Sequence, residues 1–147
     1  MARSYRELFV WQKARTFAVQ VYRETERFPK IETYGLSAQL RRASVSVVSN
    51  IAEGQGRLTR GEFAHFLGLA RGSLLEVDAQ IAIAIDLGYL TAETFEKLDR
   101  QIYQILGLLN RLMSQCDRLS RDQREVNAKA FLAEPSEPCV DFETLKP

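Results

Sequence analysis

The side chains with which this chain could perform chemistry are few and scattered. Its one histidine, His65, stands between Phe63 and Phe66, and its two cysteines, Cys116 and Cys139, are distant in sequence. A structural zinc site needs about four nitrogen or sulfur ligands close together, and a general base needs a nucleophile or acid beside it. His65 is therefore interpreted as a structural or surface residue. We predict no catalytic residue, metal ligand or cofactor, and expect the chain not to be an enzyme.

Two weaker constellations also have simpler explanations. The Gly-Gln-Gly-Arg stretch at 54–57 lacks the Lys-Ser/Thr pair and the preceding strand of a phosphate-binding P-loop, so it predicts a turn. Glu53 and Glu76 could form a carboxylate pair, but a di-metal helical bundle also needs two Glu-x-x-His motifs, and the chain has one histidine. Glu53 is better explained as the partner of a nearby arginine, with Arg42, Arg57 and Arg71 as candidates.

Charge is distributed unevenly along the chain. Residues 1–60 hold 11 Lys and Arg against 5 Asp and Glu, a balance of +6, whereas residues 61–147 hold 9 against 14, a balance of −5, which together give the net +1. Either facing helices neutralise one another, within the bundle or across subunits, or a basic face binds an anionic partner. Without a helix-turn-helix, zinc-finger or aromatic-platform signature, nucleic acid would be bound mainly through phosphates. The candidate contacts are Lys13, Arg15, Arg23, Arg41, Arg42, Arg57 and Arg60.

The elements that must position these residues are predicted to be helices. Apolar residues recur at steps of three and four over about 6–27, and Pro29 ends that helix. A second helix is predicted over about 37–52, with Gly54 and Gly56 as its stop. Residues 44–49 are poor helix formers, so a short strand is the competing interpretation. Helix is favoured because the period continues on both sides.

A stripe of small polar residues accompanies the second helix. Gly72 in the middle of the third helix costs about 1 kcal/mol relative to alanine, and close approach of a neighbouring helix would explain it. We expect Ser46, Ser49 and Asn50 to meet Gly72 and Ser73 there. The predicted polar seam, for packing or assembly, consists of Ser46, Asn50, Glu53, Gly72, Ser73 and Glu76.

The third and fourth helices have clear boundaries. Thr59 and Glu62 match a capping box, and Gly88 is a C-terminal stop. The run 81–85 is apolar on more than one side, which is typical of a helix covered by a second partner surface or central to its own bundle. The fourth helix should start after Thr91 and continue, with a weaker pattern, from 117 to 132.

Four amphipathic helices with short links predict an all-α, antiparallel up-down-up-down four-helix bundle over residues 1–116. Residues 117–147 are predicted to be a helical extension followed by a tail with Pro135 and Pro138. The tail either is disordered or docks through Val140, Phe142 and Leu145. Without a signal peptide or a membrane-length apolar stretch, we expect a cytoplasmic protein with free thiols and no membrane partner.

The same residues carry a family resemblance over about residues 5–115. The matching pieces are Leu8, Val10-Trp11-Gln12-Lys13-Ala14, Phe28-Pro29, Tyr34-Gly35-Leu36, Gln39-Leu40-Arg41-Arg42-Ala43, Ser46, Asn50-Ile51-Ala52-Glu53-Gly54, Arg57, Glu62-Phe63, Phe66-Leu67, Ala70, Gly72-Ser73-Leu74 and Glu76. In these the chain resembles the bacterial four-helix-bundle proteins encoded in intervening sequences of 23S ribosomal RNA genes. Val47-Val48 departs from the Ile-Pro that family members often carry.

The resemblance implies a homopentamer without an attached enzyme activity. A related bundle, the accessory protein of diversity-generating retroelements, binds nucleic acid and partners a reverse transcriptase. We therefore predict a non-enzymatic homo-oligomer that contacts RNA or DNA through its first two helices, with a reverse transcriptase or another protein as a further partner. The alternative is a protein-interaction scaffold with no nucleic-acid role. A metal-dependent enzyme is disfavoured because the ligands are missing.

Overall fold

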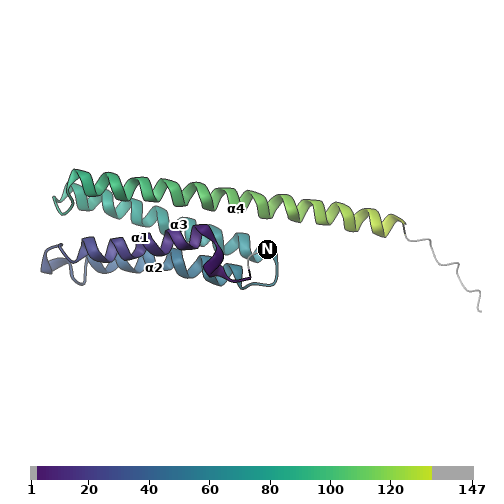
Figure 1. The fold of residues 1–147 in the computed structure, drawn as a ribbon, viewed down its shortest axis with the longest axis horizontal. Helices are drawn as coiled ribbons and strands as arrows, with labels where there is room; N and C mark the ends of the chain where they lie inside the picture. The colour runs from purple at the N-terminus through teal and green to yellow at the C-terminus, as the bar shows by residue number, and fades with distance from the viewer. Residues whose placement is uncertain (1–2, 134–147) are drawn as a thin grey trace, which may run out of the picture.

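The computed structural model describes residues 3–133, and every regular element in this range is helical. The α-helices are α1 (Phe9–Thr25), α2 (Leu36–Gln55), α3 (Arg60–Asp86) and α4 (Ala92–Ala133). Two single-turn 3-10 helices, η1 (Tyr5–Glu7) and η2 (Lys30–Glu32), precede α1 and α2. The all-α prediction is confirmed, and the segment for which a strand competed lies inside α2 (Figure 1).

The helices form an antiparallel up-down-up-down bundle, as predicted (Figure 1). The most extensive packing is between α2 and α3, and α1 packs against α2 and α4. Within the described part of the chain the backbones of α1 and α3 do not run side by side, so the two helices stand diagonally opposite each other. A surface on the outer side of α1 therefore points away from a surface on the outer side of α3.

The core is one continuous apolar cluster at the positions that the periodicity predicts. The predicted stripe of the first helix is buried from Trp11 to Thr25, and Phe17 is completely inaccessible. Val47 and Ile51 of α2 and Leu74 of α3 are equally inaccessible. In contrast, α3 also leaves apolar side chains on its outer side, among them Leu69, which is 45% exposed, and Ile83, which is 52% exposed.

The chemistry of the helix ends explains where three of the boundaries fall. Thr59 and Glu62 form the predicted capping box, in which the Glu62 N–H donates to Thr59 Oγ1 at 3.2 Å. After α3, Gly88 has a φ of +77° and the Tyr89 N–H donates to the Ala84 carbonyl at 2.9 Å. This arrangement is a Schellman motif, whose left-handed residue favours glycine. Helix α1 begins at Phe9, later than predicted, because Tyr5–Glu7 form the separate turn η1.

Two glycines do not have the roles that the sequence predicts. Gly54 does not stop α2, which continues to Gln55 and is capped by Gly56. Instead Gly54 is buried, and a Cβ there would lie 2.6 Å from Phe66 Cβ and 3.1 Å from Phe63 Cδ2. The close approach of α2 and α3 thus requires glycine at position 54. The prediction that Gly72 serves this purpose is wrong, since a Cβ on Gly72 would meet no atom of another described element within 4 Å.

Helix α4 continues well beyond the other three helices (Figure 1). Cys116 is its last buried residue, and every described residue after it except Ser120 is exposed. The predicted helical extension is confirmed as far as Ala133, while the tail residues Val140, Phe142 and Leu145 lie outside the described residues. No helix in the described range is both long and apolar enough to cross a membrane.

Candidate functional site

The outer side of α1 presents cations that lie over aromatic rings. Lys13 Nζ lies 5.1 Å from the centre of the Phe9 ring, and the Arg15 guanidinium carbon lies 5.1 Å from that of Trp11. Such contacts hold a cation through the negative face of the ring without neutralising its charge. Arg23, two turns further on, is exposed. Lys13 and Arg15 lie about 160° apart around the helix and Arg23 falls between them, so the three residues span the outer half of α1.

Arg41 joins this surface from α2 and also has a structural role. Its Nε donates to Thr25 Oγ1 at 2.9 Å and its Nη2 to the Tyr22 carbonyl at 3.3 Å. Its guanidinium carbon lies 4.7 Å from the centre of the Tyr22 ring. The Tyr22 carbonyl also accepts from the Glu26 N–H at 3.2 Å, so Arg41 adds a further donor to the last turn of α1 and ties α2 to it.

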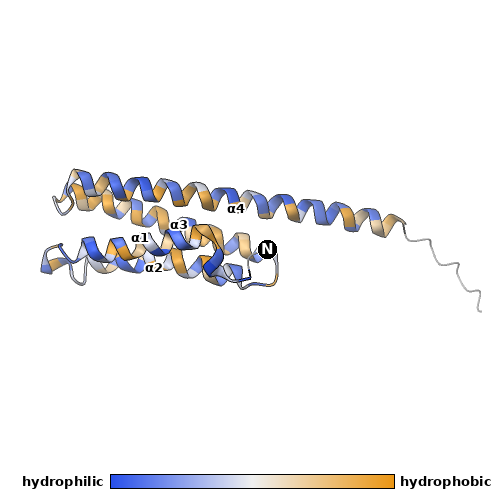
Figure 2. Cartoon of the chain, in the orientation of Figure 1, coloured by the Kyte–Doolittle hydropathy of each residue, from blue (hydrophilic) through white to orange (hydrophobic). Residues whose placement is uncertain are grey.

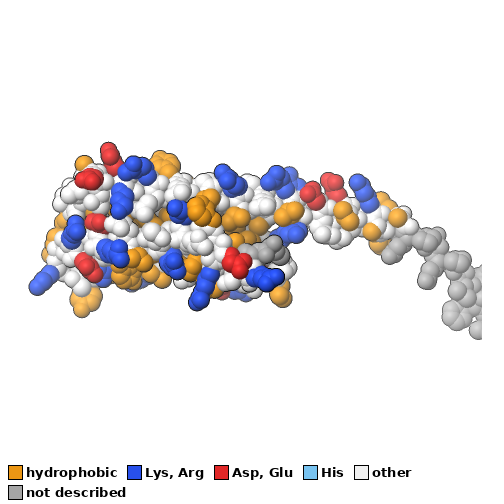
Figure 3. All heavy atoms as spheres, viewed as in Figure 1, with side chains coloured by type: hydrophobic (Ala, Val, Ile, Leu, Met, Phe, Trp, Pro, Cys, Tyr) orange, Lys and Arg blue, Asp and Glu red, His pale blue; other side chains and the backbone are white. Residues whose placement is uncertain are grey.

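Two grooves run along these side chains. A groove of about 410 Å³ between α1 and α2 has an apolar floor that includes Val19 and Val45, with Arg15 and Arg23 also on its wall. A second groove, of about 330 Å³, is lined by Arg6, Lys13 and again Arg15. Arg15 therefore connects the two. Figure 3 shows Lys and Arg side chains spread along the α1 side of the bundle, with apolar patches and some Asp and Glu side chains between them. We call Arg6, Lys13, Arg15, Arg23 and Arg41 the α1 basic surface.

No carboxylate of residues 3–133 forms an ion pair with this surface. Among residues 3–133 the only side-chain ion pair joins Arg57 and Glu53, at 2.7 Å. Glu24, the acidic residue of α1 that lies nearest to Arg23 in sequence, accepts a hydrogen bond from Gln20. The interpretation that facing helices cancel the basic half within the bundle is thus not supported for α1. The positive charge remains available to a partner.

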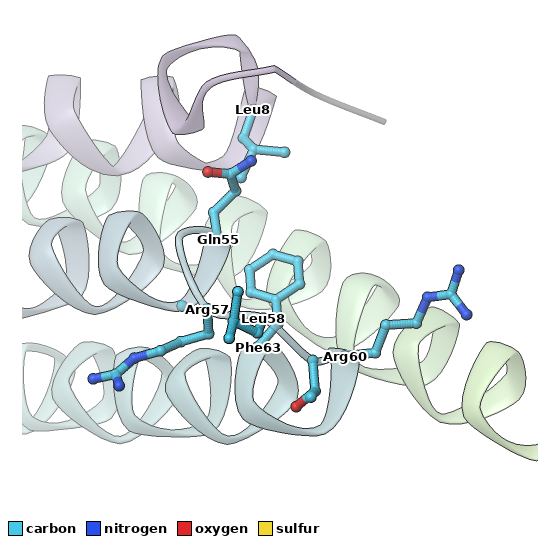
Figure 4. A pocket seen from close by; sticks show the side chains of 8 residues that line it. Leu8, Gln55, Arg57, Leu58, Arg60 and Phe63 are labelled. Atoms are coloured by element: carbon cyan, nitrogen blue, oxygen red, sulfur yellow. The ribbon is translucent and has the colours of Figure 1, made fainter.

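The other three predicted contact residues lie elsewhere. Arg42 follows Arg41 in sequence but lines a groove of about 290 Å³ between α2 and α3, together with Glu76. Arg57 pairs with Glu53 and lies over the Phe66 ring, at 4.6 Å from its centre. Figure 4 shows Arg57 and Arg60 pointing in opposite directions from the loop that joins α2 to α3. These arginines do not extend the α1 basic surface.

The Gly-Gln-Gly-Arg stretch is a turn, as predicted. The Gly56 N–H donates to the carbonyls of Ala52 and Glu53, and the Arg57 N–H donates to that of Gly54 at 3.1 Å. These donors are engaged within the turn and are not directed at a ligand. The pocket of about 360 Å³ beside it is lined by Leu8, Leu58 and Phe63 among others (Figure 4). Gln55, Arg57, Thr59 and Arg60 also line it, and Figure 4 shows the two arginine side chains pointing away from each other.

The polar seam between α2 and α3 forms in part. Ser46 Oγ and Ser73 Oγ are 2.9 Å apart, and Asn50 Nδ2 donates to the Ser46 carbonyl at 2.9 Å and to Ser46 Oγ at 3.1 Å. Glu76 joins through Gln80, whose Nε2 donates to Glu76 Oε1 at 3.2 Å. Glu53 leaves the seam for Arg57, and Gly72 has no partner in it.

Sequence reasoning missed two members of this seam. Gln80 is 94% buried, and its Nε2 also lies 3.4 Å from Gln39 Oε1 on α2. Both residues continue the polar stripes at helical spacing, Gln80 after Ser73 and Glu76, and Gln39 before Arg42 and Ser46. Extending each stripe by one step would have found them. The seam is a packing device, since hydrogen-bonded polar groups between helices fix their register.

The remaining chemistry-bearing residues form no site. His65 is exposed, as a surface histidine would be, and its ring contacts that of Phe66 with centres 5.7 Å apart. Within the described range no three His, Cys, Asp or Glu residues are grouped as a metal would require. Burial raises the pKa of the Cys116 thiol, with a further contribution from Asp117. A protonated, buried thiol is a poor nucleophile.

Comparison with known proteins identifies relatives for most of the chain. The family described as 23S rRNA-intervening sequence protein matches residues 6–111, which is more than two thirds of the sequence. A solved structure from Bacteroides thetaiotaomicron, a protein of unknown function from the S23 ribosomal protein family, superposes with a TM-score of 0.66. The two chains are 24% identical over 71% of this chain and 95% of that one, a likeness that supports the fold. No curated protein gives a significant match.

Proposed function

Because the chain belongs to the 23S rRNA-intervening sequence protein family, we propose that it is a non-enzymatic, homo-oligomeric helical bundle that binds RNA or DNA. The binding surface is the α1 basic surface. Its cations contact the phosphates, and the apolar groove between α1 and α2 contacts sugars or bases. Sequence selectivity is low, since no side-chain pattern for reading base edges accompanies the phosphate contacts.

One observation carries this proposal. The cations of α1 are held over aromatic rings, and no carboxylate of the described chain forms an ion pair with them. A phosphate backbone is a partner that supplies closely spaced negative charges in a row. Tyr22 lines the groove with 42% of its surface exposed, and the face of its ring that Arg41 does not cover lies beside the cations. Stacking of a base on such a face typically contributes about 1–3 kcal/mol.

Self-assembly is the second part of the proposal, and the outer side of α3 is the surface that supports it. Leu69, Gly72, Ala79 and Ile83 recur there at helical spacing, with the charged Glu76 between Gly72 and Ala79, and neither glycine nor alanine obstructs a neighbouring helix. Leu69 and Ile83 are about half exposed. A homopentamer would cover this surface and repeat the α1 basic surface five times. Repetition raises the avidity for a long polyanion without any new contact.

Titration of fluorescently labelled RNA and duplex DNA tests the binding surface. We compare the wild type with Lys13→Gln/Arg15→Gln/Arg23→Gln, and include Arg100→Gln/Arg111→Gln/Arg118→Gln as a matched control on α4. Each phosphate contact changes the slope of log K against log salt by about 0.7–0.9. Loss of three contacts should therefore reduce the slope by about 2–3, and the α4 triple should leave it nearly unchanged. Absence of binding at low salt, or equal losses in both triples, would refute the proposal.

Light scattering tests the assembly. Ile83→Arg places a charge on the outer side of α3 and should reduce the particle mass while the helix content is retained. Ile31→Arg is the control, because Ile31 is 84% exposed on η2 and lies away from α3. A monomeric wild type, or a mass that neither substitution alters, would refute this part.

A protein-interaction scaffold is the second candidate function, with a reverse transcriptase or another protein as the partner. The apolar floor of the α1–α2 groove favours it, since Val19 is 45% exposed and Val45 41% exposed. Small exposed apolar patches of this kind are common at protein interfaces. Val19→Asp/Val45→Asp would abolish protein capture and leave the salt slope for RNA unchanged. The reverse outcome would favour nucleic acid as the ligand.

A further inference from the structure

The part of α4 that follows Cys116 has no packing partner in the described chain. It continues as regular helix to Ala133 and projects from the end of the bundle (Figure 1). It also lies outside residues 6–111, which the family match covers. Its exposed apolar side chains include Val126, at 60%, and Phe131, at 77%. In proteins most of the stability of a helix comes from tertiary packing of its apolar face, and the described chain offers this face no such contact.

The extension continues the stripe of residues with which α4 packs into the bundle. We call this stripe the α4 seam, as distinct from the polar seam between α2 and α3. Spacings of four and three alternate without a break from Leu98 to Ala133. The positions in the bundle are Leu98, Ile102, Ile105, Leu109, Leu112 and Cys116, and those in the extension are Leu119, Gln123, Val126, Ala130 and Ala133. All members of the first group are buried except Leu112, which is partly buried, and all members of the second are exposed. An alternation of four and three is the pattern of a coiled-coil seam. In Figure 2 apolar residues recur along the otherwise hydrophilic extension.

We propose that the extension pairs with the same segment of a second copy of this chain as an antiparallel two-stranded coiled coil. The register places Leu119 opposite Ala130 of the second copy and Gln123 opposite Val126 of the second copy. The two-fold axis between the copies repeats both pairs with the roles of the two copies interchanged. Each larger side chain then faces a smaller or differently shaped one, which is how interdigitated layers fill space. The overlap covers about 16 residues (117–132), or about 24 Å of helix.

Charge complementarity selects this register. Asp122 and Lys129 both precede a seam position, so they occupy the same flank of the helix. Neither forms an ion pair with another described residue. In the proposed register Asp122 of each copy faces Lys129 of the other, so the interface contains this pair twice. A shift by one heptad in either direction would bring two copies of Asp122, or two of Lys129, face to face. A parallel in-register pair would offer Asp122 only the neutral Asn127.

The symmetry of this contact determines what it joins. An antiparallel pair has a two-fold axis, and a cyclic ring of five copies has none perpendicular to its own axis. The extensions would therefore link two rings, or two single copies if the bundle does not assemble by itself. In either case the pairing doubles the mass. The inference does not depend on the proposed nucleic-acid binding.

Charge reversal in the full-length chain tests the pairing. Asp122→Lys replaces two attractive pairs by two repulsive ones, and we expect the dissociation constant of the pairing to rise about tenfold or more. In sedimentation over a range of concentrations, this variant should approach half the wild-type mass. The double variant Asp122→Lys/Lys129→Asp should restore the full mass. Glu125→Lys is the matched control, since position 125 lies off the seam.

The four proteins distinguish the possible outcomes. Equal masses for all four would overturn the proposal, as would a double variant that fails to recover. An equal effect of Glu125→Lys would show that net charge, not this register, controls the mass. Far-UV circular dichroism checks that the bundle stays folded in each variant. Loss of RNA binding by the α1 triple variant with the mass unchanged would concern the proposed function alone.

Discussion

Gly54→Ala tests the central feature of the fold, the close approach of α2 and α3. The added Cβ would lie 2.6 Å from Phe66 Cβ, which is well below the ordinary contact range of 3.4–4 Å. Phe66 Cβ is attached to the backbone, so a change of rotamer cannot relieve the contact and the helices must separate. Overpacking of this kind costs about 1–3 kcal/mol. Alanine returns about 1 kcal/mol through helix propensity, so a net loss of up to about 2 kcal/mol is expected.

The matched control is Gly107→Ala on α4. Gly107 is exposed and helical, and a Cβ there would meet no atom of another described element within 4 Å. Its replacement should therefore gain up to about 1 kcal/mol. Urea unfolding followed by circular dichroism measures both changes, and the melting temperatures should move in opposite directions by about 2–4 °C per kcal/mol. If Gly54→Ala proved as stable as Gly107→Ala, the close approach would not exist as described.

Three further predictions concern a helix cap and two titrating groups. Thr59→Ala removes the capping box of α3 and should lower the free energy of unfolding by about 1 kcal/mol in urea titrations. Burial and a hydrogen bond to Glu32 raise the pKa of Tyr89, so the unfolded chain loses this proton first. Stability should fall as the pH rises above about 10, and less so in Tyr89→Phe, which pH-dependent melting would show. Burial raises the pKa of the Cys116 thiol and shields the sulfur from reagents. Its alkylation by iodoacetamide, followed by mass spectrometry, should therefore be at least about tenfold slower in the folded than in the unfolded protein.

Periodicity and capping residues predict the helices of this chain well, because both act locally. The same rules could also have assigned the two glycines correctly. Gly54 continues the buried stripe of Val47 and Ile51 at helical spacing, whereas Gly72 lies off the stripe formed by Ala70 and Leu74. A glycine on the buried stripe faces the neighbouring helix, and one off the stripe faces solvent. Gly54 lies next to a turn and was therefore interpreted as a helix stop. Gly72 lies next to polar residues and was therefore placed in the polar seam.

The candidate contact residues were harder to predict because charge counts ignore direction. Arg41 and Arg42 are adjacent in sequence, yet successive side chains of a helix point about 100° apart. Arg41 therefore reaches Tyr22 and Thr25 of α1, whereas Arg42 lines the groove on the α3 side. Arg57, one of the three arginines that were candidates for the partner of Glu53, forms that ion pair, which removes it from the basic surface. Which of these arginines faces α1 and which faces α3 follows only from the packing of α2 between those two helices.

The arrangement of the helices makes assembly and nucleic-acid binding compatible. Since α1 and α3 are diagonal, copies that associate through the outer side of α3 leave the α1 basic surface uncovered. The extension of α4 begins beyond the bundle, so its pairing covers neither surface. Two linked rings would then present basic surfaces on both halves of one particle. A polyanion longer than one ring could engage both halves, and its affinity would exceed that of a short oligonucleotide by more than the added phosphate contacts explain. This excess should disappear in Asp122→Lys while the affinity for a short oligonucleotide is unchanged.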